Sequence, residues 1–387
     1  MRNNSKGVFT ILCILIVYSV LPVSAQERSN SSFFSEESFS FNKELISGGF
    51  WSDLNNHFSG KQSLGFETLK SFKNKNGSWG SILIQFRLGR YDRYYTMSNG
   101  MKMYSMHLPY ENGWSFEFHD AYFKYTGNFK GKLKIKLGHF DVPFGLEENE
   151  DTHSQLTQLM SMRNLGVKKD YGLSLSGQLP HCDYNLAITN GSRYIPKNMG
   201  SYIISSRIGS PSDQNLNVGI SGMKGKVVDP MGVMRGMSMM NPMGGDMDDN
   251  MNSGMNSMTT TWFGSETKPV FDILERWRIG IDASYLFRQF AFNGEITSGR
   301  DINQTVITGL GKIDMTISEK LSSSTQIQYA YQDIDNPEFN EEVMIAFGIS
   351  YRISHHITLM TLYEHDIQQL GTIDKDRIIR ARLYIYW

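Results

Sequence analysis

The feature that most constrains this chain is a series of about sixteen segments in which apolar and polar residues alternate with a period of two. Such alternation is typical of β-strands that have one apolar and one polar face. It is especially regular over 131–140, 324–333 and 342–353. The segments lie near residues 47–57, 64–73, 79–91, 113–125, 131–140, 170–179, 183–190, 202–209, 215–227, 271–287, 289–298, 304–317, 324–333, 342–353, 356–365 and 377–387.

The links between these segments alternate in length. Turns of a few residues alternate with longer links, which lie at 92–112, 141–169, 191–201, 228–270, 334–341 and 366–376. Short turns that alternate with long loops are typical of bacterial outer-membrane barrels, which have an even number of strands. A soluble β-sandwich or β-helix is the alternative, but it does not explain this alternation. We therefore predict an all-β fold, a transmembrane antiparallel β-barrel of about sixteen strands, wide enough to hold a water-filled channel.

The last segment, 377–387, has the properties of a closing barrel strand. Ala381, Leu383, Ile385 and Trp387 share one face, and the chain stops on the aromatic residue. Barrels carry aromatic girdles at both membrane interfaces. We expect this strand to pair with the first strand, to contact outer-membrane lipid and to be recognised by the barrel-assembly machinery.

The N-terminal residues have the pattern of a secretory signal. Arg2 and Lys6 precede an apolar run over 8–23, and a small-residue cleavage pattern ends at Ala25. We predict a signal peptide over 1–25, an N-terminal segment over 26–46 and a barrel over 47–387. No later segment has the roughly 20 apolar residues that a spanning helix requires. The expected location is the bacterial cell outer membrane.

The link at 141–169 is predicted to fold into the barrel. Pro143 lacks an N–H group and cannot continue a paired strand, and Gly145 permits a sharp reversal of the chain. A loop that leaves the wall in this way can narrow the channel. Its predicted constriction residues are Pro143, Phe144, Gly145, Glu147, Glu148, Glu150 and Asp151.

Residues 115–195 resemble the phosphate-selective porin O/P family of outer-membrane porins. The strings HDAYFKY (119–125) and LGHFDVPFGLEEN (137–149) are similar to a strand and loop motif of the family, and YGLSLSG (171–177) and AITNG (187–191) are similar to its next two strands. The resemblance implies a sixteen-stranded passive channel, a homotrimer and a constriction loop over 141–169. Members of the family carry different solutes, so the resemblance does not fix the solute. The matching positions are Asp120, Ala121, Tyr122, Gly138, Phe140, Pro143, Phe144, Gly145, Leu146 and Glu147.

The strand faces opposite the apolar side supply the candidate channel lining. Strand alternation places more basic than acidic side chains on this inner face, and rings of basic side chains favour anions. The alternative is that these charges pair across strands and only keep the channel wet. The predicted channel-lining residues are Arg87, Lys132, Lys134, Lys136, Arg276, Arg278, Arg380 and Arg382.

The link at 228–270 has a composition of its own. Ten of the chain's 22 methionines lie between Met231 and Met258, among many Gly, Asn and Ser residues. Thioethers are soft ligands that favour Cu(I), so capture of soft metal ions is one hypothesis. The alternative is a low-complexity external loop without a ligand.

The sequence thus predicts a diffusion porin for small hydrophilic solutes, with a modest preference for anions such as phosphate. A barrel that handles soft metals, or one that transports hydrophobic substrates, remains as the alternative. We expect no enzymatic activity, because no nucleophile accompanies the His365–Asp366 pair and no nucleotide or zinc motif occurs. We also expect no cofactor, no resident metal and no nucleic-acid partner, since the charge is near neutral.

Overall fold

The structure is a computed structural model, in which Ser40–Trp387 form one compact unit and Met1–Phe39 form another. Only residues 38 and 39 of the smaller unit are described. The described residues are 38–53, 57–74, 77–91, 94–96, 102–104, 114–127, 131–146, 156–157, 160, 164–192, 200–228, 273–333, 340–369 and 375–387.

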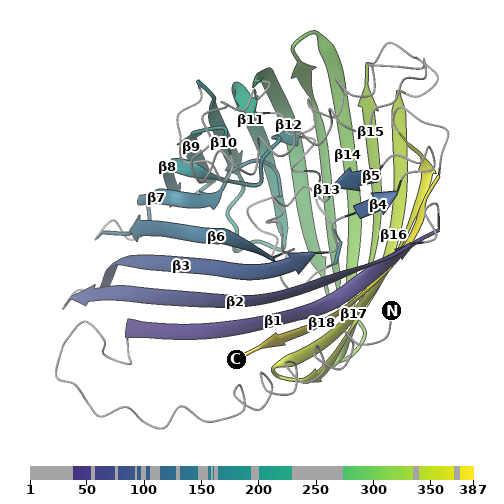
Figure 1. Ribbon diagram of the computed structural model, residues 1–387. Coiled ribbons are helices and arrows are strands. Elements are labelled where there is room, and N and C mark those ends of the chain that lie inside the picture. The colour runs from purple at the N-terminus through teal and green to yellow at the C-terminus, as the bar shows by residue number, and fades with distance from the viewer. Residues whose placement is uncertain are drawn as a thin grey trace, which may run out of the picture. The chain divides into compact units, whose positions relative to one another are not determined.

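Sixteen strands form a closed antiparallel barrel, so the predicted fold class is confirmed (Figure 1). Each strand pairs with its neighbours in sequence, except that β3 pairs directly with β6. The strands are β1 (Phe39–Ser52), β2 (His57–Asn74), β3 (Gly77–Tyr91), β6 (Trp114–Tyr125), β7 (Lys134–Asp141), β8 (Lys169–Gln178), β9 (Asp183–Thr189), β10 (Tyr202–Gly209), β11 (Leu216–Val228), β12 (Ile273–Phe287), β13 (Phe290–Asp301), β14 (Gln304–Thr316), β15 (Leu321–Gln332), β16 (Glu341–Ser354), β17 (Ile357–Gln368) and β18 (Arg377–Tyr386).

The barrel closes where β1 pairs with β18, which Figure 1 shows in purple and yellow. Beyond the strand ladder, Lys43 and Trp387 exchange two backbone hydrogen bonds of 2.8 and 3.1 Å. The start of β1 and the end of β18 therefore lie at the same end of the barrel as the short turns, which we call the turn end. The longer connections leave the opposite end, which we call the loop end.

The two faces of the wall differ as the alternation predicts. Large apolar side chains such as Leu137 and Ile296 point outward and are 59% and 69% exposed. The neighbouring inward positions are mostly polar and buried, as at Gln326 and Thr297. Among the described residues, no helix has the length and apolar character needed to cross a membrane.

Two boundaries at the N-terminal side differ from the sequence prediction. β1 begins at Phe39, so the barrel starts before residue 47 and includes part of the expected N-terminal segment 26–46. β2 begins at His57 and includes the stretch 58–63, which lies between the predicted segments 47–57 and 64–73. At the start of β1, Lys43 interrupts the alternation of Phe39, Phe41 and Leu45, and over 58–63 the only apolar residue is Phe58. Pairing with β18 and β3 makes these stretches strands nonetheless.

A third difference lies in the long link before β6. It contains a small two-stranded sheet of β4 (Tyr94–Thr96) and β5 (Lys102–Tyr104), separate from the barrel wall. Strands of three residues are too short for a period-two signal.

Candidate functional site: the inward loop and the channel wall

The chain leaves the barrel wall at the end of β7, where the sequence predicts a constriction loop. Asp141 and Lys169 are the last cross-strand partners of β7 and β8, and the Val142 amide still donates to the carbonyl of Lys168 at 2.9 Å. Lys169 closes the base of the loop, because its Nζ lies 2.6 Å from Asp120 Oδ2 and 3.0 Å from Asp141 Oδ2. Pro143 comes directly after and ends the ladder.

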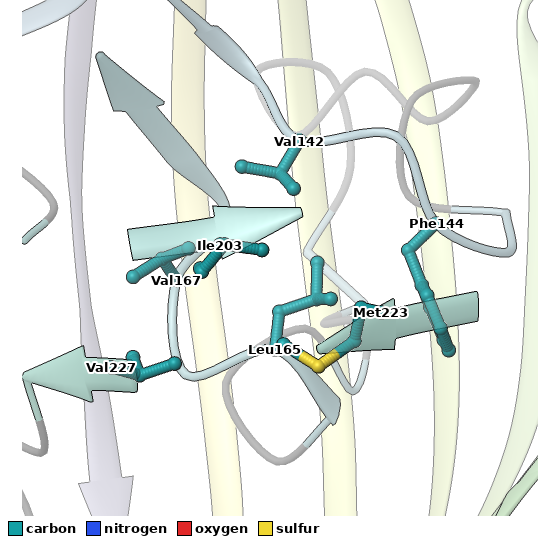
Figure 2. Packing of buried hydrophobic residues seen from close by; sticks show 7 residues of the cluster. All are labelled: Val142, Phe144, Leu165, Val167, Ile203, Met223 and Val227. Carbon is teal, nitrogen blue, oxygen red and sulfur yellow. The ribbon is translucent and has the colours of Figure 1, made fainter. Parts of the chain in front are cut away.

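The described parts of the loop pack on the inner wall through apolar side chains (Figure 2). Four loop side chains are fully buried: Val142 and Phe144 from the outgoing segment of the loop, and Leu165 and Val167 from the returning segment. They form one cluster with three inward side chains of the wall. These are Ile203 of β10 and Met223 and Val227 of β11.

Two further clusters continue the contact around the wall. Leu146 and Met160 pack on Leu310 of β14 and Ala330 of β15. Leu156 packs on a third group, which consists of Ala346 of β16 and Met360 and Leu362 of β17. The loop thus contacts wall strands from β10 to β17, and it covers the inward apolar side chains in these three clusters. An apolar lining exposed to a hydrophobic substrate is not seen at these positions.

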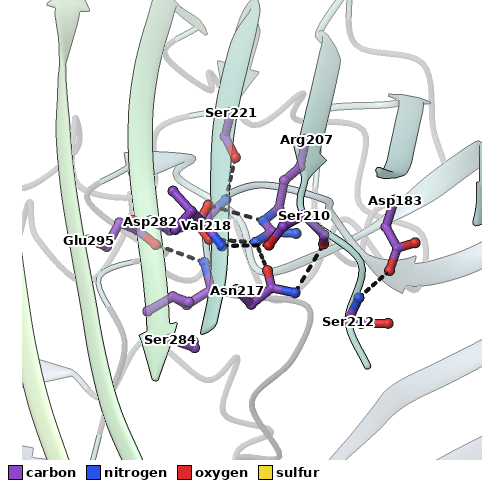
Figure 3. Close-up of polar contacts among 12 residues, drawn as sticks. Asp183, Arg207, Ser210, Ser212, Asn217, Val218, Ser221, Asp282, Ser284 and Glu295 are labelled. Atoms are coloured by element: carbon purple, nitrogen blue, oxygen red, sulfur yellow. Dashed lines mark hydrogen bonds and ion pairs between the residues drawn. The ribbon is translucent and has the colours of Figure 1, made fainter. Parts of the chain in front are cut away.

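A buried carboxylate, Glu295 of β13, which Figure 3 labels, holds both ends of the loop. Its Oε2 accepts from the backbone N–H of Leu146, and its Oε1 accepts from the side-chain amide of Asn164, both at 2.8 Å. Asn164 in turn accepts from the hydroxyls of Thr297 at 3.0 Å and Thr308 at 2.7 Å. All of these side chains are buried. The network therefore fixes the loop to β13 and β14, and it engages both oxygens of the Glu295 carboxylate.

Gly145 lies at the reversal and requires glycine for two reasons. Its φ of 54° is in the left-handed region, and a Cβ atom there would collide with the Glu295 carboxylate. Its N–H donates to Ser221 Oγ of β11 at 2.8 Å, which Figure 3 shows beside the Glu295 contact. The predicted constriction residues Pro143, Phe144 and Gly145 are thus all buried against the wall. The other four, Glu147, Glu148, Glu150 and Asp151, lie outside the described residues.

On the turn-end side of this network, Arg207 of β10 pairs with Asp282 of β12. The Nη2–Oδ1 distance is 2.5 Å and the Nε–Oδ2 distance is 3.0 Å (Figure 3). Arg207 also donates to Asn217 Oδ1 at 3.1 Å. Alternation places all three side chains on the inner face, so this bidentate pair belongs to the wall of the channel.

The predicted lining residues Arg276 and Arg278 are brought together by one carboxylate. Asp301 of β13 accepts from Arg276 Nε at 2.8 Å and from Arg278 Nη2 at 2.7 Å. Both arginines are buried, and Gly166 of the returning loop passes directly over Arg276. One carboxylate therefore offsets half of their charge within the wall, and the loop covers Arg276.

Two more of the predicted arginines are also paired. Arg87 of β3 contacts Glu44 of β1, and its Nη1 lies 2.9 Å from His119 Nε2. Arg380 of β18 pairs with Glu364 of β17 at 2.7 Å. Arg382 lies on the same inner face of β18 as Arg380. Sequence reasoning placed these arginines inward but omitted most of their inward carboxylate partners, Glu44 and Asp301 in particular.

The predicted lysines have a different environment. Lys134 and Lys136 lie on the inner face of β7 and are half-buried, and Lys132 is exposed just before the strand. The ammonium of Lys136 lies over the rings of Tyr122 and Phe140, at 5.1 and 5.3 Å from their centroids. Such cation–π contacts position a cation without neutralising its charge.

The docking positions on the wall were not predicted, although the sequence contains a signal for them. Ile203, Met223, Val227, Leu310, Met360 and Leu362 are large apolar residues on a face that is otherwise polar. Apolar residues at lumen-facing positions need a cover. No comparable signal identifies Glu295, because its partners are far away in the sequence.

Comparison with protein-family models finds no match, and comparison with curated proteins finds none either. Solved structures do match across most of the chain. One is OmpT of Vibrio cholerae in a trimer form, with a TM-score of 0.57 at 8% identity; the match covers 90% of this chain and 99% of that chain. An anion-selective porin from Comamonas acidovorans gives a TM-score of 0.56 at 10% identity, and the match covers 90% of this chain and 99% of the porin. OprB of Pseudomonas putida gives a TM-score of 0.56 at 9% identity, and the match covers 91% of this chain and 94% of OprB.

At sequence identities this low, the comparisons support the fold and no other property of this chain. They support the closed antiparallel barrel as the fold of this chain. The assignment to the phosphate-selective porin O/P family remains an expectation from residues 115–195. The chain has the fold of the sixteen-stranded outer-membrane porins.

Proposed function

We propose that this protein is a diffusion porin of the bacterial outer membrane, and that small hydrophilic solutes cross it through the barrel lumen. The observation that carries the proposal is the loop after β7, which is fixed on the inner wall of a closed sixteen-stranded barrel by three apolar clusters and by Glu295. A barrel of this size leaves an aqueous channel. A loop fixed inside the barrel narrows this channel and leaves it open. No reaction is required, so the proposed role is transport and not catalysis.

The same proposal includes a modest preference for anions such as phosphate, and it assigns this preference to Lys134 and Lys136. Four of the predicted arginines are paired with three carboxylates, which offset most of their positive charge. Lys134 and Lys136 place two further basic side chains on the inner face of β7, and the Lys136 ammonium lies over two aromatic rings. In a narrow channel with low-dielectric walls, a small local excess of positive charge acts on every ion that passes.

The assembly that we propose is a homotrimer, as the resemblance implied. The OmpT structure in trimer form supports this at the level of fold. Outer-membrane lipid surrounds the trimer, and the barrel-assembly machinery recognises β18. The oligomer is tested by the mass of the detergent-solubilised protein with the detergent contribution subtracted; a monomeric mass would contradict it.

The single experiment that tests the proposed function is recording from planar bilayers that contain the purified protein. We expect stepwise ohmic conductance and, in a tenfold KCl gradient, a reversal potential on the anion-selective side. The absence of conductance steps would refute the channel. A cation-selective reversal potential would leave the channel intact and refute the anion preference.

The soft-metal alternative depends on the methionines between Met231 and Met258, which lie outside the described residues. It stays a prediction. A peptide that spans this segment should bind Cu(I) or Ag(I) and not Zn(II), because thioethers prefer soft ions. A peptide without affinity for either ion under reducing conditions would eliminate the idea.

A further inference from the structure

A row of three side chains on the outer face of the barrel has no role in the channel. Lys224 of β11 is the cross-strand partner of Trp277 of β12, and Trp277 is the partner of Arg300 of β13. The residues next to them along the strands, such as Met223 and Arg278, point inward and are buried. Lys224, Trp277 and Arg300 therefore point outward, and all three are exposed. We call them the outer basic row.

The row lies at the border of the apolar band that faces lipid. Toward the turn end, the next outward row is Gly222, Ile279 and Ser298, and the row after it is Ile220, Ile281 and Ile296, three of the most exposed apolar side chains. Toward the loop end the strands stop within a few residues, at Val228, Ile273 and Asp301. A Trp near the loop-end edge of the wall agrees with the enrichment of Trp at membrane interfaces.

The two cations of the row are not compensated within the described part of the chain. No ion pair to Lys224 or Arg300 occurs among the described residues, whereas the next outward pair, Lys226 and Glu275, is an ion pair of 3.3 Å. The inward arginines of the same strands are likewise paired with Asp301. A few strands further around the barrel, the outward loop-end positions of β15 and β16 include Tyr329 and Glu341, which bond to each other at 3.3 Å. On β11–β13, the outward cations Lys224 and Arg300 thus have no counter-charge among the described residues, whereas Lys226 has one.

We infer that the outer basic row binds the phosphate groups of a phosphorylated glycolipid, the class of lipid that forms the outer leaflet of bacterial outer membranes. Arg300 can hold a phosphate in a bidentate manner, and Lys224 supplies a second point charge. Neighbouring strands lie about 4.8 Å apart, so the two cations are separated by roughly 10 Å across Trp277. A disaccharide headgroup with a phosphate at each end spans a comparable length, and the indole between the cations offers an amphipathic surface at the headgroup level.

The inference rests on the proposed function in one respect, because the lipid site requires the loop end of the barrel to lie at the cell surface. Basic side chains at a membrane surface each contribute about 1 kcal/mol to binding of anionic lipid. Loss of both cations should therefore weaken the complex by roughly 10- to 30-fold. Free phosphate lacks the second phosphate group and the apolar chains, so it should compete poorly.

The test uses the full mature protein in detergent micelles, with bisphosphorylated lipid A as the probe and native mass spectrometry as the measurement. Wild-type protein should retain the lipid, and K224Q/R300Q should lose it with the stated change in affinity. The matched control is K320Q/R352Q, which removes one Lys and one Arg from exposed positions at the turn end. The control should bind like the wild type, and dephosphorylated lipid A should bind neither protein.

Several results would overturn the inference. These are equal loss of lipid in K320Q/R352Q, no loss in K224Q/R300Q, or displacement of the lipid by an equal concentration of inorganic phosphate. Channel recordings in phosphatidylcholine bilayers separate the two proposals. K224Q/R300Q should conduct like the wild type, because its side chains face away from the lumen. Lipid binding without any conductance would refute the proposed function and leave the lipid site standing.

Discussion

The Glu295 network allows a quantitative prediction about the loop. The Glu295 carboxylate accepts from the Leu146 amide and from the Asn164 side chain, and all three groups are buried. In Glu295→Gln one carboxylate oxygen becomes an NH₂ group, which faces a donor and cannot accept from it. One buried donor is left without a partner, at a cost of about 1–3 kcal/mol. Glu295→Ala leaves both donors unpaired and roughly doubles this cost.

The apolar contacts of the loop contribute more free energy to docking than the unpaired donor costs. Seven loop side chains belong to the three apolar clusters, and burial of each contributes about 1.5–3 kcal/mol as an upper estimate. The loop of Glu295→Gln should therefore remain docked and open locally around Leu146 and Asn164. A change of about 1–3 kcal/mol raises the population of the open form roughly 5- to 150-fold.

Two measurements report this opening. Amide hydrogen exchange at Leu146 should speed up by the same factor, because exchange follows the open population. Single-channel records should show more current noise at an unchanged mean conductance. Glu319→Gln, in the exposed turn before β15, is the control and should behave like the wild type. If exchange at Leu146 in Glu295→Gln matched that control, the buried carboxylate would not be what holds the loop.

Three further predictions concern selectivity, docking and closure. Replacing Lys134 and Lys136 by Glu should move the reversal potential toward cation selectivity, more strongly at low salt where screening is weaker, and an unchanged potential would remove these lysines from the pathway. Phe144→Ala should destabilise loop docking by about 3–5 kcal/mol and raise the mean conductance. The control is Phe116→Ala on the outer face, which should change neither loop docking nor conductance. Deleting Trp387 removes two backbone bonds to Lys43 and should slow the appearance of the heat-modifiable folded band on gels; an unaltered rate would argue against a role for this residue in closure.

Much of the architecture could be predicted from local sequence. The outward face of each strand is recognisable because its apolar residues recur every second position, and Pro143 and Gly145 mark the point where the chain leaves the wall. The same rule fails at the start of β1 and over 58–63. At the start of β1, Lys43 interrupts the alternation of Phe39, Phe41 and Leu45, and over 58–63 the only apolar residue is Phe58. Pairing with another strand decides the structure at both places.

The charge balance of the wall could not be predicted in the same way. Alternation assigns a side chain to a face, but it does not say which strand neighbour lies opposite. The contact of Arg87 with Glu44, or of Arg207 with Asp282, depends on the register between strands and on closure of the barrel. A sequence count of inward charges therefore overestimates the positive charge that an ion meets.

This difference between arginines and lysines has a consequence for how the channel can change. Arg276 and Arg278 share Asp301 beneath the loop, so removing that carboxylate would leave two buried cations uncompensated, at a cost of about 3–5 kcal/mol for a broken buried pair. Lys134 and Lys136 are only half-buried, so their charge can be changed at little cost in stability. Under the proposed function, stability and selectivity thus depend on separate side chains of the same inner face. Substitutions that alter the preferred solute are therefore expected on β7, and the arginines of β3, β10, β12 and β18 are expected to tolerate change only together with their carboxylate partners.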